Sequence, residues 1–384
     1  MTEASVEVTL TDDQQFFRET TDRFLSSKCD IAEVRRLVGT VDGFDRGYWS
    51  QGAELGWTSL LVPEAQGGGS ISGDGVVDLS VVADVFGRRV APGPLMPANV
   101  VAGALAAAGD DGHADLLGRI LSGEAVTAWC GAEHALGSGS VTATRGDDGY
   151  ALSGASAPVE AAAQADTLLV TAGSNGDLAQ FVVPVTSEGV TVTPLAGLDP
   201  VRRFARVDFD AAAVPATARL ETAGTVADDV ERQLQHVLVM QAAMLVGAAE
   251  RTFEFTVDWA FDRYSFGRPL ASYQELKHRF ADMKMWLEAS HALAAALARE
   301  VQVGAPGAAE TASATKAYLG AHLAELMQDC VQMHGGIGLT TDHDLHLYLR
   351  RVSADRSLFG TPAQHRQRLA ALAIAANPAQ GSAA

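Results

Sequence analysis

The sequence predicts an α+β protein in which a β domain separates two helical regions. Three observations predict it. Apolar residues recur at helical spacing before about residue 122 and again after about residue 225. Between these regions, short strand-like runs alternate with Gly, Asp and Asn turns. At 384 residues, the chain is long enough for two or three domains, each with its own core.

The first helical domain is expected over residues 1–122. Thr11 and Asp12 provide side chains that can cap an amphipathic helix near the start of the chain. A glycine-rich, irregular stretch over residues 56–73 interrupts the pattern, and VVDLSVVADVFGRR then resumes it. A cluster of prolines ends this second helix, because proline cannot continue a helix from its interior.

The middle domain is expected over residues 123–220. Its runs TATR, YALSG, DTLLVTAG, AQFVVPV, VTVTPL and ARVDFD are short, rich in β-branched residues and separated by turn residues. This pattern predicts an antiparallel sheet.

The last domain, over residues 221–384, is expected to be a helix bundle. Its first helical run, VERQLQHVLVMQAAMLVGAAERTFEFTVDWAFDR, is far longer than an average soluble helix of about 11 residues, which suits a bundle. Aromatic residues within this run, at mostly helical spacing, predict core packing: Phe253, Phe255, Trp259 and Phe261. Three more helices are predicted over 273–302, 308–334 and 342–356.

The composition excludes several classes of function. A net charge of −19 would repel a phosphate backbone, so we expect no nucleic-acid partner. No apolar run reaches the roughly 18 residues of a membrane span, and the acidic N-terminus lacks a signal-peptide pattern, so a cytoplasmic location is expected. The three cysteines are too far apart in the sequence to suggest a disulfide or zinc framework.

Two segments of the last domain carry residues suited to a dinucleotide. One reads R-x-x-F-G-x-P and continues to a glutamine, and the other reads Q-x-x-G-G-x-G. An arginine offers forked donors to a pyrophosphate, and paired glycines let a backbone approach a cofactor closely. The residues concerned are Arg263, Phe266, Gln274, Gln332, Gly335 and Gly336.

Both motifs, together with LGWTSLLVPEAQGG near the N-terminus, resemble the acyl-CoA dehydrogenase family over nearly the whole chain. The resemblance implies an N-terminal helical domain, a middle β domain and a C-terminal four-helix bundle. It also implies FAD as cofactor and an acyl-CoA as substrate. In the family, the residues of the two motifs reach across a dimer interface to the ADP part of the neighbour's FAD, and the resemblance implies this role for the six residues named above.

The middle domain departs from the family pattern where the flavin ring would lie. The hydroxyl position of one family motif is Ala132 here, and its acidic position is Gly139. A second family stretch carries lysine, tryptophan and threonine against the isoalloxazine, and here these positions are Ser156, Pro158 and Glu160. Proline also removes a backbone donor. Binding of the flavin through backbone contacts alone remains an open alternative.

The catalytic base of the family also has no counterpart. A raised-pKa carboxylate must take the weakly acidic α-proton of the thioester while FAD accepts the β-hydride. The family places this glutamate at one of three positions, which are Val237, Met244 and Phe359 here. The first two lie 26 and 19 residues before Arg263, seven apart and thus on one helix face. We therefore assign no catalytic residue to this chain.

Other candidate residues carry weaker signals. Glu231 and Glu250 are carboxylates on the same helix, but the first suits a helix start and the second points about 120° away from Met244. His236 is turned about 100° from the neighbouring base position. His343 and His346 are one helical turn apart, yet the segment HDLHLYLRR recurs in the family without a metal, so no metal site is expected.

These observations favour a complementing subunit, in which this chain supplies half of the FAD site to a paralogous subunit that carries the catalytic glutamate. RPLASYQELKHRFADM and GGIGLTTDHDLHLYLRR resemble the heterotetrameric α2β2 acyl-CoA dehydrogenases of actinobacterial steroid side-chain degradation, which implies a steroid-CoA substrate. One alternative is a self-sufficient homotetrameric enzyme with a relocated base. Another is a non-enzymatic scaffold, against which the retained arginine and glycines count.

Overall fold

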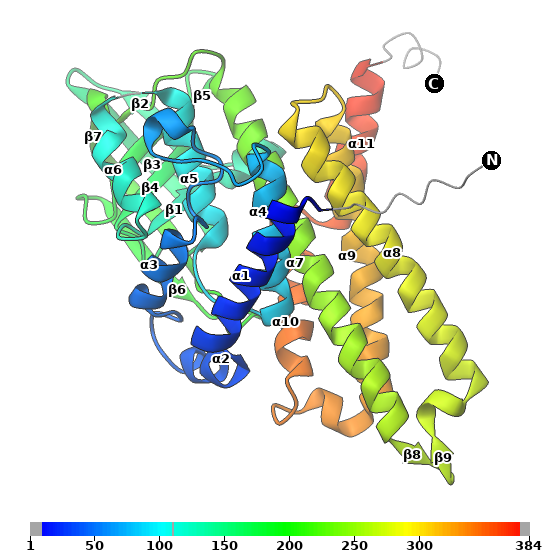
Figure 1. Cartoon of the computed structure of the whole chain (residues 1–384). Coiled ribbons are helices and arrows are strands. Elements are labelled where there is room, and N and C mark those ends of the chain that lie inside the picture. The colour runs from blue at the N-terminus through cyan, green and yellow to red at the C-terminus, as the bar shows by residue number, and fades with distance from the viewer. Residues whose placement is uncertain (1–9, 110, 377–384) are drawn as a thin grey trace. The chain divides into compact units, whose positions relative to one another are not determined.

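A computed structural model of the chain describes residues 10–109 and 111–376 (Figure 1). The described residues form two compact units. The β unit comprises residues 23–79 and 92–237, and the bundle unit comprises those up to residue 22, 80–91 and those from 238 onward. Helix α7 (Val226–Asp262) therefore contributes its first part to the β unit and its remainder to the bundle unit.

The β unit contains a seven-stranded mixed sheet whose strands follow the order β1-β4-β2-β3-β7-β6, with β5 paired to β4. The predicted antiparallel pairing holds for most of the sheet, in which β3 pairs with β2 and β7, β4 with β5, and β6 with β7. It fails at β4, which pairs in parallel with β1 and β2. The strand β1 was not predicted at all, since its four residues are all buried and show no alternation of polar and apolar side chains. The strands are β1 (Thr127–Cys130), β2 (Thr142–Arg145), β3 (Gly149–Glu160), β4 (Thr167–Ser174), β5 (Asp177–Pro184), β6 (Val190–Leu195) and β7 (Phe204–Pro215).

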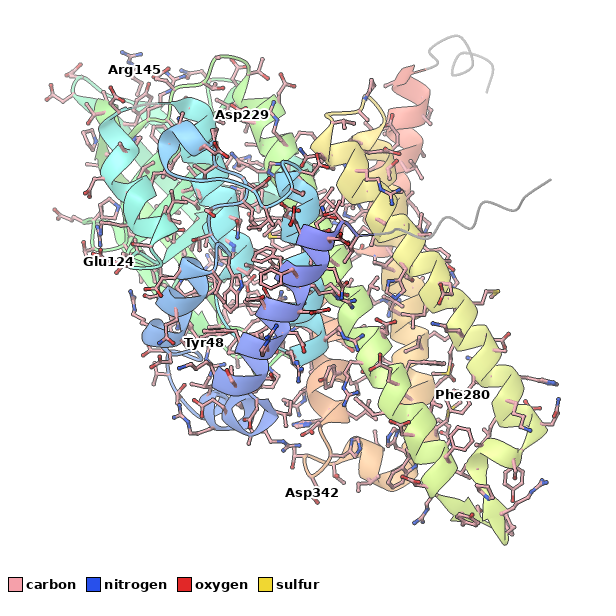
Figure 2. All side chains as sticks on the ribbon, in the orientation of Figure 1. Tyr48, Glu124, Arg145, Asp229, Phe280 and Asp342 are labelled. Carbon is pink, nitrogen blue, oxygen red and sulfur yellow. The ribbon has the colours of Figure 1, made fainter. Side chains whose placement is uncertain are left out.

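Helices of the β unit pack around aromatic side chains, and α5 lies against β1. Tyr48, labelled in Figure 2, is buried and donates its hydroxyl hydrogen to Pro92 O over 3.2 Å. The proline cluster ends α4 as predicted, although Pro97 itself lies in the first turn of α5, where a missing N–H is harmless. The helices are α2 (Ile31–Val38), α3 (Arg46–Glu54), α5 (Leu95–Ala108) and α6 (Ala114–Leu121), with parts of α1 (Asp12–Lys28) and α4 (Gly75–Arg89).

The bundle unit contains the remainder of α7, four further helices, and the parts of α1 and α4 that the β unit does not include. Helix α9 packs against α8, α10 and α11 (Figure 1). The helix predicted over 308–334 has those bounds, whereas α11 was not predicted because its sequence has no clear apolar stripe. None of the described helices is long and apolar enough to cross a membrane. The helices are α8 (Gln274–Gln302), α9 (Ala308–His334), α10 (Leu345–Asp355) and α11 (Pro362–Ala376).

Two glycines allow α4 and α7 to approach closely within the bundle unit. A Cβ added to Gly87 would lie 2.0 Å from Met244 O, and one added to Gly247 would lie 2.2 Å from Asp84 O. Because these neighbours are backbone atoms, they cannot move aside cheaply. The crossing also fixes Met244, one of the three base positions, in a buried site that is 3% exposed.

Candidate functional site

The first predicted dinucleotide segment forms a tight hairpin at the end of α7. Strands β8 (Tyr264–Ser265) and β9 (Arg268–Pro269) pair with each other, and Leu270 N donates to Arg263 O over 2.8 Å. The Tyr273 hydroxyl donates to Ser265 O over 2.7 Å and closes the loop. This arrangement leaves the Arg263 side chain exposed and Phe266 97% exposed.

The second segment lies at the end of α9, where Gly335 adopts φ +67° and ψ −143°. Glycine reaches this conformation without the strain that a side chain would impose. No atom lies within 4 Å of a Cβ added at Gly335 or Gly336, and both residues are exposed. Gln332 and Gln274 are exposed as well. The Gly335 N–H itself caps α9 by donating to Gln332 O and Val331 O, while the exposed backbone of the two glycines stays open to the approach of a ligand.

A hydrogen bond connects the two segments. The indole Nε1 of Trp259 donates to Met333 O over 3.2 Å, and Arg263 N donates to Trp259 O over 2.8 Å. Arg263 and Gly335 therefore flank a single contact between the last turn of α7 and the last turn of α9. Arginine donors and an exposed glycine backbone fit the diphosphate of a dinucleotide, so the bundle unit has residues suited to FAD.

The flavin-facing segments of the β unit are instead bound to each other. The short 3₁₀ turn after β1 carries Glu133, whose carboxylate accepts from the Ser156 hydroxyl at 3.0 Å and from Ala157 N at 3.1 Å. The same hydroxyl accepts from Gly131 N at 2.9 Å. Ser156, which is 2% exposed, takes the place of the family's lysine and joins the turn to β3.

Two further replacements fill this part of the β unit. The imidazole of His134 contacts Val141 O at 3.0 Å through Nε2 and lies over Gly139. A Cβ added to Gly139 would lie 2.2 Å from that ring, so the family's acidic residue would displace it. Glu160, at the family's threonine position, is 8% exposed and lies 3.7 Å from the buried Arg202 guanidinium. These residues do not fit a flavin ring held as the family holds it.

The positions of the family's base are all apolar. Val237 is 1% exposed, and the half-buried Phe359 occupies the third position in a loop with φ +57°. Lys316 donates to Leu358 O over 2.8 Å, and His365 Nε2 contacts Phe359 O at 2.8 Å. The loop is thus held in place although it carries no carboxylate.

The alternative bases have environments that oppose proton abstraction. The hydrogen bond from His291, with the charges of His291 and Arg88, lowers the pKa of Glu250 to about 2, whereas a base needs a raised pKa. The Arg88 guanidinium lies 2.6 Å from the Glu250 carboxylate. Glu231 accepts from the Gln235 side-chain amide over 2.9 Å.

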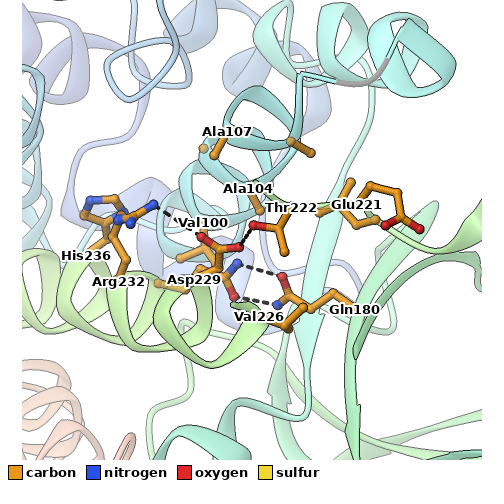
Figure 3. A pocket seen from close by; sticks show the side chains of 14 residues that line it. Val100, Ala104, Ala107, Gln180, Glu221, Thr222, Val226, Asp229, Arg232 and His236 are labelled. Carbon is orange, nitrogen blue, oxygen red and sulfur yellow. Dashed lines mark hydrogen bonds and ion pairs between the residues drawn. The ribbon is translucent and has the colours of Figure 1, made fainter. Parts of the chain in front are cut away.

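His236 lines a separate pocket within the β unit, with a cavity volume of about 30 Å³ (Figure 3). Burial lowers its pKa to about 4, with a further contribution from Arg232, so it is neutral at pH 7. Across the cavity, the Gln180 and Gln233 amides bind each other at 2.7 and 3.0 Å, and Asp229 accepts from the Thr222 hydroxyl. His236 thus faces this cavity on α7 beside Val237.

No cluster of three or more metal-ligating side chains occurs within residues 10–109 and 111–376. His343 Nδ1 accepts from Leu345 N over 3.1 Å, and Asp342, labelled in Figure 2, is exposed.

The predicted aromatic core is partly wrong: Phe253 packs edge-on against Phe280 at 5.8 Å, but Phe261 is 63% exposed. It lies in the last turn of α7, beside the exposed hairpin.

The chain belongs to the acyl-CoA dehydrogenase family, whose cofactor is FAD. Residues 11–124 match the family's N-terminal domain and residues 228–374 its C-terminal domain. The chain is 30% identical over 365 residues to the acyl-CoA dehydrogenase FadE27 of Mycobacterium tuberculosis, covering 90% of this chain and 93% of that one. It is 29% identical over 365 residues to the acyl-CoA dehydrogenase IpdE2 of the same organism, covering 93% and 96%.

Two solved structures share the fold at 25% sequence identity. One is a variant of the steroid acyl-CoA dehydrogenase Tcur3481-Tcur3483, with a TM-score of 0.85 over 98% of this chain and 100% of that one. The other is the ChsE4-ChsE5 complex from Mycobacterium tuberculosis, with a TM-score of 0.84 over 96% and 98%. The predicted family, fold class and cofactor are therefore confirmed.

Sequence reasoning missed several residues that shape the site. Glu133, Arg202, Trp259 and His334 were not singled out for these contacts, because their partners are distant in sequence or are backbone atoms. Lys316 had a usable signal: it is one of only four lysines and stands in the small-residue run SATKAYLG. A lone lysine in such a run predicts a buried charge with dedicated acceptors.

Proposed function

We propose that this chain is the base-lacking subunit of a heteromeric acyl-CoA dehydrogenase, and that it completes the FAD site of a paralogous subunit that carries the catalytic glutamate. One observation carries the proposal: the two halves of the family's FAD site differ within this chain. The half formed by Arg263, Gly335 and Gly336 is exposed, and the space beside both glycines is open. The half in the β unit is filled by contacts among its own side chains.

The chemistry of the reaction supports this division. FAD supplies the hydride acceptor when it is bound. This chain contributes charge and an open backbone: Arg263 would hold the diphosphate in forked hydrogen bonds, and Gly335 and Gly336 would let the cofactor approach the backbone closely. It offers no carboxylate at a base position, and the pKa of Glu250 is shifted in the direction opposite to the one that a base needs.

We propose a CoA thioester of a steroid side chain as the substrate of the complex. The support is the likeness to Tcur3481-Tcur3483, a steroid acyl-CoA dehydrogenase, and to the ChsE4-ChsE5 complex. The pairing of two different chains in the names of both structures also supports a heteromeric assembly. Most contacts with the substrate would come from the partner, which carries the base.

The experiment compares the chain purified alone with the chain co-expressed with a base-bearing acyl-CoA dehydrogenase subunit from the same genome. We expect flavin absorption and acyl-CoA-dependent reduction only in the complex. A yellow chain that an acyl-CoA reduces without any partner would establish the self-sufficient enzyme instead. Colour in neither preparation would favour the scaffold.

A variant pair tests the residues of the half-site. Arg263→Ala in the complex should remove a charge-assisted bidentate contact worth roughly 2–3 kcal/mol, weakening FAD binding about 30- to 150-fold. Arg299→Ala is the control, since Arg299 is an exposed arginine at the far end of α8. Equal flavin content in both variants would contradict the role of Arg263.

A further inference from the structure

The exposed glycines at the end of α9 lie next to a group of aromatic rings. The His334 ring stacks on Trp259, with centroids 5.1 Å apart and planes 19° apart. His343 packs against His334 with its centroid at 4.7 Å, and Phe255 meets both histidines edge-on at 5.8 and 5.6 Å. His334 is 5% exposed, whereas the next residue, Gly335, is exposed.

Specific hydrogen bonds attach this aromatic group to the backbone just before the glycines. The last carbonyls of a helix have no partner inside it. Trp259 Nε1 donates to one of them, Met333 O, over 3.2 Å. His334 Nδ1 donates to Cys330 O over 2.8 Å, which places the lone pair of the neutral ring on the buried Nε2 atom.

The chain then folds back over the same histidine. A Cβ added to Gly338 would lie 2.9 Å from His334 Cβ and 3.1 Å from Val331 O, so the turn after the glycines rests directly on His334. Gly335 and Gly336 form the outer edge of that turn, with no atom within 4 Å of an added Cβ. The Gly335 N–H donates to Gln332 O and Val331 O, so the path of the turn depends on the end of α9 and on the rings that pack against it.

We infer that Trp259 and His334 are positioning residues, which set the backbone of Gly335 and Gly336 in the orientation that receives the FAD of the partner subunit. The inference rests on the proposed function, because it needs the FAD half-site to be used. Neither residue is proposed to contact the cofactor directly. Trp259 acts through Met333 O, and His334 acts through its stacking and its bond to Cys330 O.

The test measures FAD dissociation from the heteromeric complex by flavin fluorescence. Trp259→Phe keeps a ring for stacking and removes the donor to Met333 O. It should raise the Kd for FAD about five-fold, the factor expected for one neutral hydrogen bond. Trp259→Leu also removes the stacking and should raise it further. Trp286→Phe is the control, because Trp286 is a half-buried tryptophan on α8 away from both motifs.

A second measurement separates positioning from general destabilisation. The thermal unfolding midpoint of the FAD-free complex should be the same for Trp259→Phe and Trp286→Phe, while only the former loses affinity. A Kd within two-fold of the control, or a loss of affinity matched by a lower midpoint, would overturn the inference. If Arg263→Ala retains FAD as well, the proposed function itself fails. If Arg263→Ala loses FAD and Trp259→Phe does not, only the positioning role fails.

Discussion

Replacing Lys316 with methionine should destabilise the bundle unit by about 3–5 kcal/mol, the range for uncompensated buried polar groups. Lys316 is 3% exposed, and its ammonium group donates to the Gln241 side-chain oxygen, Asp355 O and Leu358 O. Methionine preserves the volume and leaves three acceptors that each cost about 1–3 kcal/mol when buried without a donor. Partial relaxation of the loop that contains Leu358 keeps the total loss of stability below the sum of the three separate penalties.

Urea unfolding followed by far-ultraviolet circular dichroism measures this loss. The control is Lys284→Met, because Lys284 lies on the surface of α8 and makes an i,i+4 pair with Glu288 at 2.6 Å, worth about 0.5 kcal/mol or less. Hydrogen exchange adds a local measurement: amides in the Leu358–Thr361 loop should exchange faster only in the Lys316 variant. A difference between the two variants below about 1 kcal/mol, with unchanged exchange in the loop, would refute the reasoning.

Two more predictions follow from buried groups of the bundle unit. Burial lowers the pKa of His365 to about 4. Below pH 6.5 the unfolded chain therefore binds a proton at this residue, whereas the folded chain does not bind it until the pH approaches 4. His365 should account for a fall in stability of about 2 kcal/mol between pH 7 and pH 5 in urea titrations, and His365→Gln should remove this part of the fall while the contribution of His236, whose pKa is also lowered to about 4, remains; equal losses in the two proteins would contradict the assignment. Gly247→Ala would place its Cβ 2.2 Å from Asp84 O and should cost about 1–3 kcal/mol in the same assay. Gly118→Ala, with nothing within 4 Å of the new Cβ, should be neutral or stabilising; similar values for both would exclude the clash.

The sequence predicted the long helices well because their apolar period persists over many turns. The predicted bounds 308–334 coincide with α9, and the strand run VTVTPL coincides with β6. Short or uniformly apolar elements gave no such signal. The strand β1 is buried throughout, and the helix α11 is Ala-rich, so neither shows the contrast between two faces on which such predictions depend.

The motif residues were predictable, but the contacts that decide their use were not. Arg263 and Gly335 were identified through the resemblance of their motifs to the family, and both are exposed as a ligand-facing role requires. The contact between Glu160 and Arg202 joins residues 42 positions apart, and that between Trp259 and Met333 O joins residues 74 apart. A single sequence carries no information about which distant groups meet, so both had to come from the structure.

The difference between the two half-sites has a physical basis in how polar groups are satisfied. A buried polar group must find partners inside the chain, and in the β unit Glu133 does so through Ser156 and Ala157 N. Inserting a flavin there would have to break these bonds as well as move His134. In the bundle unit, by contrast, Gly335 and Gly336 are exposed and the space beside each is open, so a ligand could approach this backbone without displacing a side chain. This difference in accessibility between the two segments is the asymmetry that a mixed pair of subunits would use.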